Sequence, residues 1–382
     1  MSITALDKQY VAGTYNRFPV EIVRGKGAVC WDAAGKRYID MGTGIGVTAF
    51  GYADESWQAA VTAQLSAVQH TSNLYYTEPC AKLAEALCTR TGLSKVFFAN
   101  SGAEANECAI KVARNYAAEK KGNDHHVIVT LTNSFHGRTL TTLAATGQDH
   151  FHGLFQPLTP GFVHTPANDL AAFEAVLNEH KVAGVLFECV QGEGGVLNLT
   201  EEFVQGMAKL CAEQDVLLMV DEVQTGNGRT GKLYAYQHYG ITPDVVTTAK
   251  GLGGGLPIGA CMMSQKCDTV LGYGDHGSTY GGNPVCCAGA LNVINRIDEA
   301  LLAGVLEREA YIRQRLRGYT VTGRGLMLGI ETAKPVGEVI AACREKGVLV
   351  LSAKQKVRLL PPLNIPMEIL AEAMDAIVEA LK

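Results

Sequence analysis

Short apolar runs rich in β-branched residues alternate with longer amphipathic stretches along the chain. A run that is apolar at almost every position is typical of a strand buried on both faces. The stretches between the runs, such as 105–120 and 201–214, have helical spacing, and strands that alternate with helices predict a mostly parallel sheet. We therefore expect a doubly wound α/β core, with strands at 95–100, 126–131, 182–190, 216–223, 244–250 and 258–264.

The two ends of the chain follow a different pattern. A long helix is predicted through 299–317, followed by the apolar runs TVTGRGLMLGIE and GVLVLSAK and a closing helix after Pro366. Near the N-terminus WDAAGKRYIDM resembles a hairpin, but a segment of this length is too short to fold alone. We expect a large domain over 48–285 and a smaller α+β domain formed by both ends, 1–47 and 286–382.

Composition narrows the kind of partner. The chain of 382 residues has 33 basic and 38 acidic side chains, a net charge of −5, which gives no electrostatic basis for binding nucleic acid or an anionic membrane. A small-molecule site is the default expectation. The 11 cysteines form no CxxC pair and predict buried free thiols in a reducing compartment. Without an apolar leader or a long apolar run, the expected location is the cytoplasm.

The first segment with candidate chemistry is FFANSGAEANE, where a strand runs into a helix. Ser101 and Glu104 have the spacing of a capping box, which places the helix N-terminus at Ser101, Gly102 and Ala103. The free backbone N–H groups and the positive end of the helix dipole suit a phosphate there. An ordinary capped helix is the competing interpretation.

Two further strand ends carry charged residues. VLLMVDEV ends in Asp221 and Glu222, at the edge where α/β sheets bind ligands, although one of the two could simply cap the next turn. DVVTTAK places Lys250 at the end of an apolar strand, where desolvation lowers the pKa of the amine and favours Schiff-base formation, unless the amine reaches solvent. A phosphate anchor, a carboxylate and an amine are the groups that a pyridoxal phosphate enzyme needs.

With these motifs the chain resembles the class III (fold type I) aminotransferases over essentially its whole length, and most closely the acetylornithine aminotransferases. The matching stretches include TYNRFPV, FFANSGAEANECAIKVAR, SFHGRT, ECVQGEGG, DEVQTGNGRTG, AKGLGGGLPIGA, HGSTYGGNP, RGLMLGIE and VRLLPPL. The resemblance implies pyridoxal 5′-phosphate as cofactor, a Schiff base at Lys250 and pairing of Asp221 with the pyridinium. It also implies a homodimer with shared active sites. The other implied cofactor contacts are Ser101, Gly102 and Ala103 with the phosphate, Phe135 stacked on the ring, Gln224 with the ring hydroxyl, and Thr279 with the phosphate of a second subunit.

The same resemblance assigns the substrate side of the site. Arg138 and Arg358 match positions that hold substrate carboxylates, Glu193 is the residue that can neutralise Arg358, and Ser278 belongs to the substrate-binding group. Without the resemblance, either arginine would be expected at the surface. His136 is left without a role.

Some remaining positions are expected to carry no chemistry. His150 and His152 are expected in a surface loop, because no Cys or carboxylate partner has a spacing that suggests a metal site. The sequence departs from the family's usual Gly-His at Gly51–Tyr52 and from its usual Glu-Pro at Glu188–Cys189. Neither departure carries chemistry in this interpretation.

Ile45 bears on the choice of substrate. Ornithine δ-aminotransferases carry a tyrosine at this position, which holds a free α-amino acid group. An apolar residue cannot supply that hydrogen bond and suits a donor whose α-nitrogen is acylated. The expected reaction moves the 5-amino group of N2-acetylornithine to 2-oxoglutarate, giving N-acetylglutamate 5-semialdehyde and glutamate, in arginine biosynthesis. Succinylornithine, N-succinyl-diaminopimelate and 4-aminobutyrate stay open as donors, and so does an aminomutase of the same fold.

Overall fold

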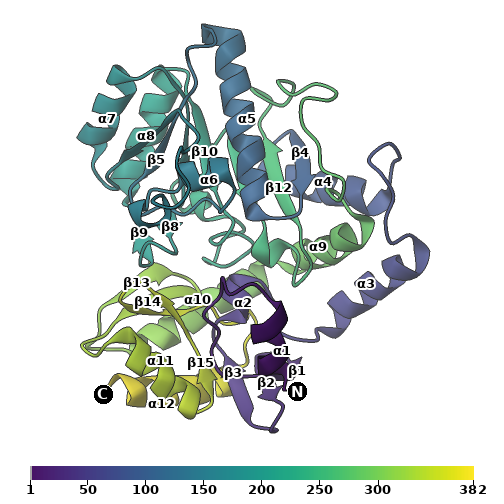
Figure 1. The fold of residues 1–382 in the computed structure, drawn as a ribbon, viewed down its shortest axis with the longest axis vertical. Helices are drawn as coiled ribbons and strands as arrows, with labels where there is room; N and C mark the ends of the chain where they lie inside the picture. Colours follow the sequence, from purple (N-terminus) through teal and green to yellow (C-terminus); the bar gives the residue numbers. More distant parts are fainter. Residues whose placement is uncertain (1) are drawn as a thin grey trace.

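The computed structural model of the protein describes residues 2–382, and its upper half in Figure 1 is built on one sheet of seven strands. The order is β4-β12-β11-β10-β7-β5-β6, and β12 runs antiparallel to both of its neighbours while the other pairings are parallel. The predicted mostly parallel sheet is therefore confirmed. Its strands are β4 (Lys95–Ala99), β5 (Val127–Leu131), β6 (Phe162–Thr165), β7 (Val182–Phe187), β10 (Leu217–Asp221), β11 (Val245–Thr248) and β12 (Gly259–Met263).

Helices cover both faces of this sheet, as a doubly wound fold requires. Helix α5 (Gly102–Lys121) packs on one face, where Leu217 and Met219 of β10 join its buried side chains in one apolar cluster. Leu218 and Val220 of the same strand point into the larger cluster on the opposite face, which includes buried side chains of α8 (Glu201–Glu213). The strand is buried on both sides, so its sequence is apolar at every one of these positions. The remaining helices of this half are α3 (Glu55–Ala67), α4 (Glu78–Thr91), α6 (Leu140–Ala145), α7 (Leu170–Glu179) and α9 (Pro284–Arg296).

The two ends of the chain meet in the lower half of Figure 1. The predicted hairpin is present as β2 (Val29–Asp32) and β3 (Arg37–Asp40), and β3 also pairs in parallel with β15 (Val348–Leu349) from near the C-terminus. A separate antiparallel sheet has the order β13-β14-β17-β16. The elements of this half are α1 (Ile3–Tyr10), β1 (Ile22–Lys26), α2 (Thr43–Gly46), α10 (Glu299–Arg315), β13 (Val321–Arg324), β14 (Met327–Glu331), α11 (Val336–Glu345), β16 (Leu351–Ala353), β17 (Lys356–Leu359) and α12 (Met367–Leu381).

The exact division into two domains stays a prediction. β3 and β15 share one sheet across the expected N-terminal and C-terminal segments, whereas α9, which begins at the expected boundary, packs against α3 and α4 of the large half. Within residues 2–382 no helix combines the length and the apolar character needed to cross a membrane. All 11 cysteines are free, and eight of them are buried.

Candidate active site

The loops that follow the parallel strands converge on a cavity of about 460 Å³ at the carboxyl edge of the large sheet. This edge is where open α/β sheets bind ligands, because loop residues and helix N-termini gather there. Eight of the residues predicted to bind cofactor or substrate line the cavity. They are Ser101, Gly102, Ala103, Phe135, Arg138, Asp221, Gln224 and Lys250.

The N-terminus of α5 forms one wall, and the predicted capping box is only half correct. The Ser101 hydroxyl accepts the N–H of Glu104 at 3.2 Å, as expected. The Glu104 carboxylate accepts the N–H of Asn100 at 2.6 Å instead of that of Ser101, and the Asn100 side chain donates to the same oxygen at 2.9 Å. A Cβ at Gly102 would lie 2.6 Å from Val223 Cγ1, so the close approach of the next loop requires glycine.

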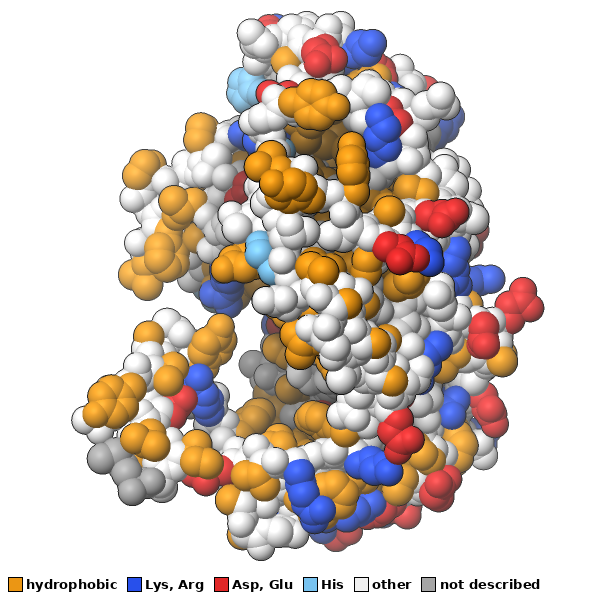
Figure 2. Space-filling view, turned by 90° about the vertical axis from the view of Figure 1, so that its right-hand side faces the viewer, with side chains coloured by type: hydrophobic (Ala, Val, Ile, Leu, Met, Phe, Trp, Pro, Cys, Tyr) orange, Lys and Arg blue, Asp and Glu red, His pale blue; other side chains and the backbone are white. Residues whose placement is uncertain are grey.

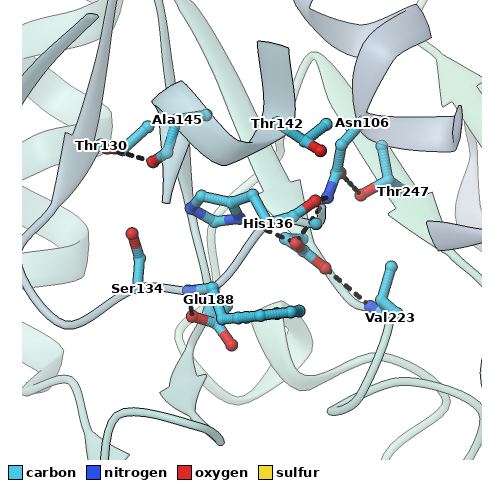
Figure 3. A network of polar contacts seen from close by, with 12 residues as sticks. Asn106, Thr130, Ser134, His136, Thr142, Ala145, Glu188, Val223 and Thr247 are labelled. Atoms are coloured by element: carbon cyan, nitrogen blue, oxygen red, sulfur yellow. Dashed lines mark hydrogen bonds and ion pairs between the residues drawn. The ribbon is translucent and has the colours of Figure 1, made fainter. Parts of the chain in front are cut away.

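Asp221 ends β10 with its carboxylate buried and held on three sides. Its Oδ1 accepts the N–H of Val223 at 3.0 Å, while Asn106 Nδ2 and His136 Nδ1 each lie 2.8 Å from Oδ2 (Figure 3). The Asn106 amide is itself fixed, because its oxygen accepts the Thr247 hydroxyl at 2.6 Å. These contacts fix the orientation of the Asp221 carboxylate at the cavity wall.

Sequence reasoning missed Asn106 and left His136 unassigned. Their roles come from three segments that meet only in the folded chain: the first turns of α5, the loop after β5 and the end of β10. The position of His136 beside Phe135 was the one signal available. His136 Nε2 is buried without a hydrogen-bond partner among residues 2–382, so the ring's polar contact is made through its other nitrogen.

Glu222, beside Asp221, has a structural role. It is fully buried, accepts the Thr225 hydroxyl at 2.5 Å and the N–H of Tyr236 at 2.8 Å, and so caps two turns. Burial raises the pKa of Glu222 to about 7, although the hydrogen bond from Thr225 opposes the shift. Of the two adjacent carboxylates, Asp221 lines the cavity and Glu222 holds the turns.

Lys250 faces the cavity from a strained backbone. β11 ends at Thr248, two residues earlier than expected, and Lys250 begins a short 3₁₀ turn with a φ of +43°, a conformation that costs energy in a residue other than glycine. Burial lowers the pKa of the Lys250 amine, against the opposing charge of Glu193. No hydrogen bond or ion pair holds its Nζ within residues 2–382. The amine therefore lies in the cavity wall and not in open solvent.

Arg358, which is buried, and Glu193, which is partly exposed, form an ion pair next to the cavity. Arg358 lies on β17 of the C-terminal sheet, is 3% exposed, and contacts the Glu193 carboxylate at 2.5 Å through Nη1 and at 3.4 Å through Nη2. Gln224 joins the pair by accepting from Arg358 at 3.1 Å and donating to Glu193 at 3.3 Å. Burial alone would raise the pKa of Glu193, but the charge and hydrogen bond of Arg358 outweigh it and the pKa is lowered.

Comparison with known proteins now identifies the family. Residues 10–381 match the family described as aminotransferase class-III. The chain belongs to the class III aminotransferases. It is 48% identical to an acetylornithine aminotransferase of Haemophilus ducreyi, with 99% of this chain and 98% of the relative covered, and 43% identical to one of Aquifex aeolicus, with 97% and 100% covered.

Solved structures of two aminotransferases have the same fold. The ornithine aminotransferase of Toxoplasma gondii superposes with a TM-score of 0.95 at 32% identity, covering 99% of this chain and 94% of that one. The N-acetylornithine aminotransferase of Stenotrophomonas maltophilia gives 0.85 at 34% identity, covering 99% and 98%. The resemblance and the fold type predicted from the sequence are confirmed.

The residues of this aminotransferase fit pyridoxal phosphate. A glycine at the N-terminus of α5 leaves backbone N–H groups open for a phosphate, and the buried Asp221 carboxylate suits a protonated pyridine nitrogen. Lys250 supplies an amine whose pKa is lowered, and the Phe135 side chain lines the same cavity. The donor set therefore matches an anion, a cationic ring and an aldehyde in one cavity.

The substrate side of the aminotransferase is more open. Arg138 is exposed at the rim of the cavity, with its guanidinium 4.1 Å from the centroid of the Phe151 ring and 5.5 Å from that of Phe135. Ile45 is 40% exposed with a φ of +67°, and Val47, two residues further on, lines the cavity. Arg138 and Lys250 therefore line the same cavity, with Arg138 on its exposed side.

Ser278 and Thr279 lie outside the cavity of a single chain. The Ser278 hydroxyl accepts from Asn100 Nδ2 at 3.0 Å, so it supports the residue before the phosphate cradle. Thr279 is exposed. The other predicted site residues either line the cavity or form the Glu193–Arg358 pair. Ser278 and Thr279 do neither in the structure of one chain.

Two expectations about other residues need correction. His152 is buried, not in a surface loop, because its Nε2 lies 3.0 Å from Leu143 O and 2.8 Å from Thr146 O and ties the following turn to α6. His150 is exposed, and residues 2–382 contain no group of three or more side chains placed to hold a metal. Glu188, given no role in the sequence interpretation, lines the cavity beside Phe135.

Proposed function

We propose that this aminotransferase uses pyridoxal 5′-phosphate to move the 5-amino group of N2-acetylornithine to 2-oxoglutarate. The observation that carries the chemistry is the pairing, in one cavity, of a buried Asp221 carboxylate with a Lys250 amine whose pKa is lowered. The choice of donor is supported by relatives 41–48% identical over nearly the whole chain that are named acetylornithine aminotransferase. An apolar residue at Ile45 supports the same choice.

Each part of the cavity would hold one part of the cofactor. Ser101, Gly102 and Ala103 would bind its phosphate, Asp221 would keep its pyridine nitrogen protonated, and Phe135 would stack on its ring. Gln224 would contact the ring hydroxyl. When bound, the cofactor accepts the electron pair that is left when a proton leaves the substrate carbon.

Lys250 would then have two tasks. It would hold the aldehyde of the cofactor before the amino donor arrives, and it would afterwards act as the base that moves the proton from the substrate carbon. Burial lowers the pKa of Lys250, which increases the fraction of free amine near neutral pH. The left-handed backbone at Lys250 aims the side chain into the cavity at a cost that the surrounding fold supports.

The Glu193–Arg358 pair would let one pocket accept two differently charged molecules. Glutamate and 2-oxoglutarate carry a carboxylate next to the reacting carbon, whereas the 5-carbon of acetylornithine carries none. With Glu193 on Arg358 the positive charge is neutralised and acetylornithine fits; a substrate carboxylate would displace Glu193 and bind Arg358. Arg138 at the rim would hold the distant carboxylate of either substrate.

A homodimer with shared active sites is part of the same proposal. Thr279 is exposed outside the cavity of its own chain, as expected of a residue that reaches the phosphate of a second subunit. Large apolar side chains are also exposed near it and on other loops, and Figure 2 shows apolar side chains gathered on one face. The exposed large apolar side chains include Leu74, Tyr75, Tyr76, Tyr273 and Tyr280. We place the enzyme in the cytoplasm, in arginine biosynthesis.

A panel of amino donors assayed with 2-oxoglutarate tests this function. N2-acetylornithine should be the best substrate among acetylornithine, succinylornithine, N-succinyl-diaminopimelate, ornithine and 4-aminobutyrate, with one glutamate formed for each donor consumed. A better rate with another donor would reassign the substrate and leave the chemistry standing. Product formation without a keto acid would instead indicate an aminomutase.

A further inference from the structure

Glu188 joins two loops of the site through the two oxygens of one carboxyl group. It lies one residue beyond β7 and is 5% exposed. Its Oε2 accepts the N–H of Phe135 at 3.0 Å, and its Oε1 accepts the N–H of Gly192 at 3.4 Å (Figure 3 shows the first contact). The first loop carries the ring that would stack on the cofactor, and the second carries Glu193.

The two loops touch each other at further points. Gln191 Nε2 donates to the carbonyl of Thr132 at 3.0 Å. A Cβ at Gly194 would lie 2.4 Å from the carbonyl oxygen of Asn133, so the backbones approach as closely as glycine allows. The loops therefore form one packed unit, and Glu188 ties it to the end of the sheet.

Gly192, bound by Glu188, directly precedes the residue that contacts Arg358. A Cβ at Gly192 would lie 2.5 Å from Gln224 Oε1, so its backbone is confined between Glu188 on one side and Gln224 on the other. The carboxylate of Glu193 then lies 2.5 Å from Arg358 Nη1. A shift of Gly192 away from Glu188 would therefore move Glu193 relative to Arg358.

The chemistry of this position requires a carboxyl group. Burial and the negative charge of Asp221 raise the pKa of Glu188, and the N–H of Phe135, the charge of Lys250 and the N–H of Gly192 oppose that shift. A glutamine of the same shape has one accepting oxygen and one donating nitrogen, so it can accept from only one of two N–H groups. Burial disfavours the charge of the acid, but a carboxyl group offers an accepting oxygen to each of the two N–H groups.

We propose that Glu188 is a positioning residue that couples the loop bearing Phe135 to the Glu193–Arg358 pair, and thereby favours the donor without a carboxylate at the reacting carbon. This inference rests on the proposed function. Loss of the bridge should leave Glu193 less firmly on Arg358. The half-reaction with acetylornithine should then slow more than that with glutamate.

The test compares Glu188→Gln with Glu222→Gln, which makes the same change at a buried carboxylate that touches neither loop. Single-turnover rates of both half-reactions are measured, together with the visible circular dichroism of bound pyridoxal phosphate, which reports the asymmetric packing of the ring. Glu188→Gln should lower the acetylornithine-to-glutamate rate ratio up to about tenfold, the effect expected from one lost hydrogen bond, and weaken the dichroism. Glu222→Gln should leave both within about twofold.

A double variant identifies the route of the effect. In the Glu193→Gln background, Glu188→Gln should no longer change the rate ratio, because the coupling runs through Glu193. Equal slowing of both half-reactions with unchanged dichroism would overturn the inference, and so would no change in either. If Glu188→Gln does not fold, Glu188→Asp, which keeps both oxygens on a shorter stem, is judged by the same two results. The proposed function could also fail separately. If the wild type were inactive on both substrates, the proposed function would be refuted; if Glu188→Gln still weakened the dichroism, the role of Glu188 in positioning Phe135 would stand.

Discussion

Glu193 and Arg358 meet through both carboxylate oxygens and both terminal guanidinium nitrogens, at 2.5 and 3.4 Å, although they are 165 positions apart in the chain. Glu193 lies in the loop between β8 (Val190–Gln191) and β9 (Leu197–Asn198). Arg358 lies on β17, in the other half of the molecule. The pair therefore joins the two halves, and it contacts the cavity-lining residue Gln224. A charge at this junction can be neutralised or exposed by movement of one loop.

We expect Glu193→Gln to slow the half-reaction with acetylornithine ten- to a hundredfold, because the charge of Arg358 is no longer neutralised and a charge-assisted hydrogen bond worth about 1.5–3 kcal/mol is lost. The half-reaction with glutamate should change much less. Single-turnover absorbance of the bound cofactor separates the two. Glu202→Gln, an exposed residue on α8, is the control. Equal slowing of both halves would contradict a switching role.

Glu222 should make stability depend on pH. Its pKa in the folded protein is about 7 against an ordinary 4.5, so between these values the folded state binds the extra proton. The contribution of Glu222 to the free energy of unfolding is therefore fully present below about pH 4.5. It is lost as the pH rises through about 7, by up to about 3 kcal/mol.

Glu222→Gln removes that titration, and its amide can still accept from Tyr236 and donate to Thr225. Urea unfolding from pH 5 to 8 should show wild type losing free energy of unfolding relative to the variant. Parallel curves for the two proteins would mean that the carboxyl group titrates normally.

Ile45→Tyr should shift the donor preference toward free ornithine by about tenfold relative to acetylornithine, because the hydroxyl supplies a hydrogen bond to an α-amino acid group. The position has a φ of +67°, which is strained for isoleucine and for tyrosine alike, so the substitution should not add backbone strain. Ile45→Val is the matched control and should keep the wild-type ratio. An unchanged ratio for Ile45→Tyr would remove this residue from the account of specificity.

Thr279→Val should weaken binding of pyridoxal phosphate about tenfold through loss of one hydrogen bond to the phosphate, while Thr279→Ser should retain it. Because the hydrogen bond would come from a second subunit, the affinity for the cofactor and the association of the subunits should be linked. Equilibrium dialysis and sedimentation equilibrium measure the two. A monomer that keeps full activity on dilution would rule out the shared site.

The extent of successful sequence prediction follows the physics of each element. Strands buried on both faces, such as β10, are apolar up to their last residue and were predicted. The edge strand β6 was missed, because it has only four residues, two of them His164 and Thr165, and is only partly buried. The sequence could place Asp221 and Lys250 at the carboxyl edge of the sheet, because the first ends such a strand and the second comes shortly after one. Asn106 and Glu188 could not, because their roles depend on backbone N–H groups and carboxylates that only tertiary structure brings near.

Our central claim is that Lys250 carries the cofactor in this cavity. Borohydride reduction of the enzyme loaded with pyridoxal phosphate makes the bond between lysine and cofactor permanent, and peptide mass mapping then locates it. We predict the added mass on the peptide that contains Lys250, and its absence from Lys250→Ala, which should also lose sustained turnover. Added mass on a different lysine, together with sustained turnover by Lys250→Ala, would contradict the account.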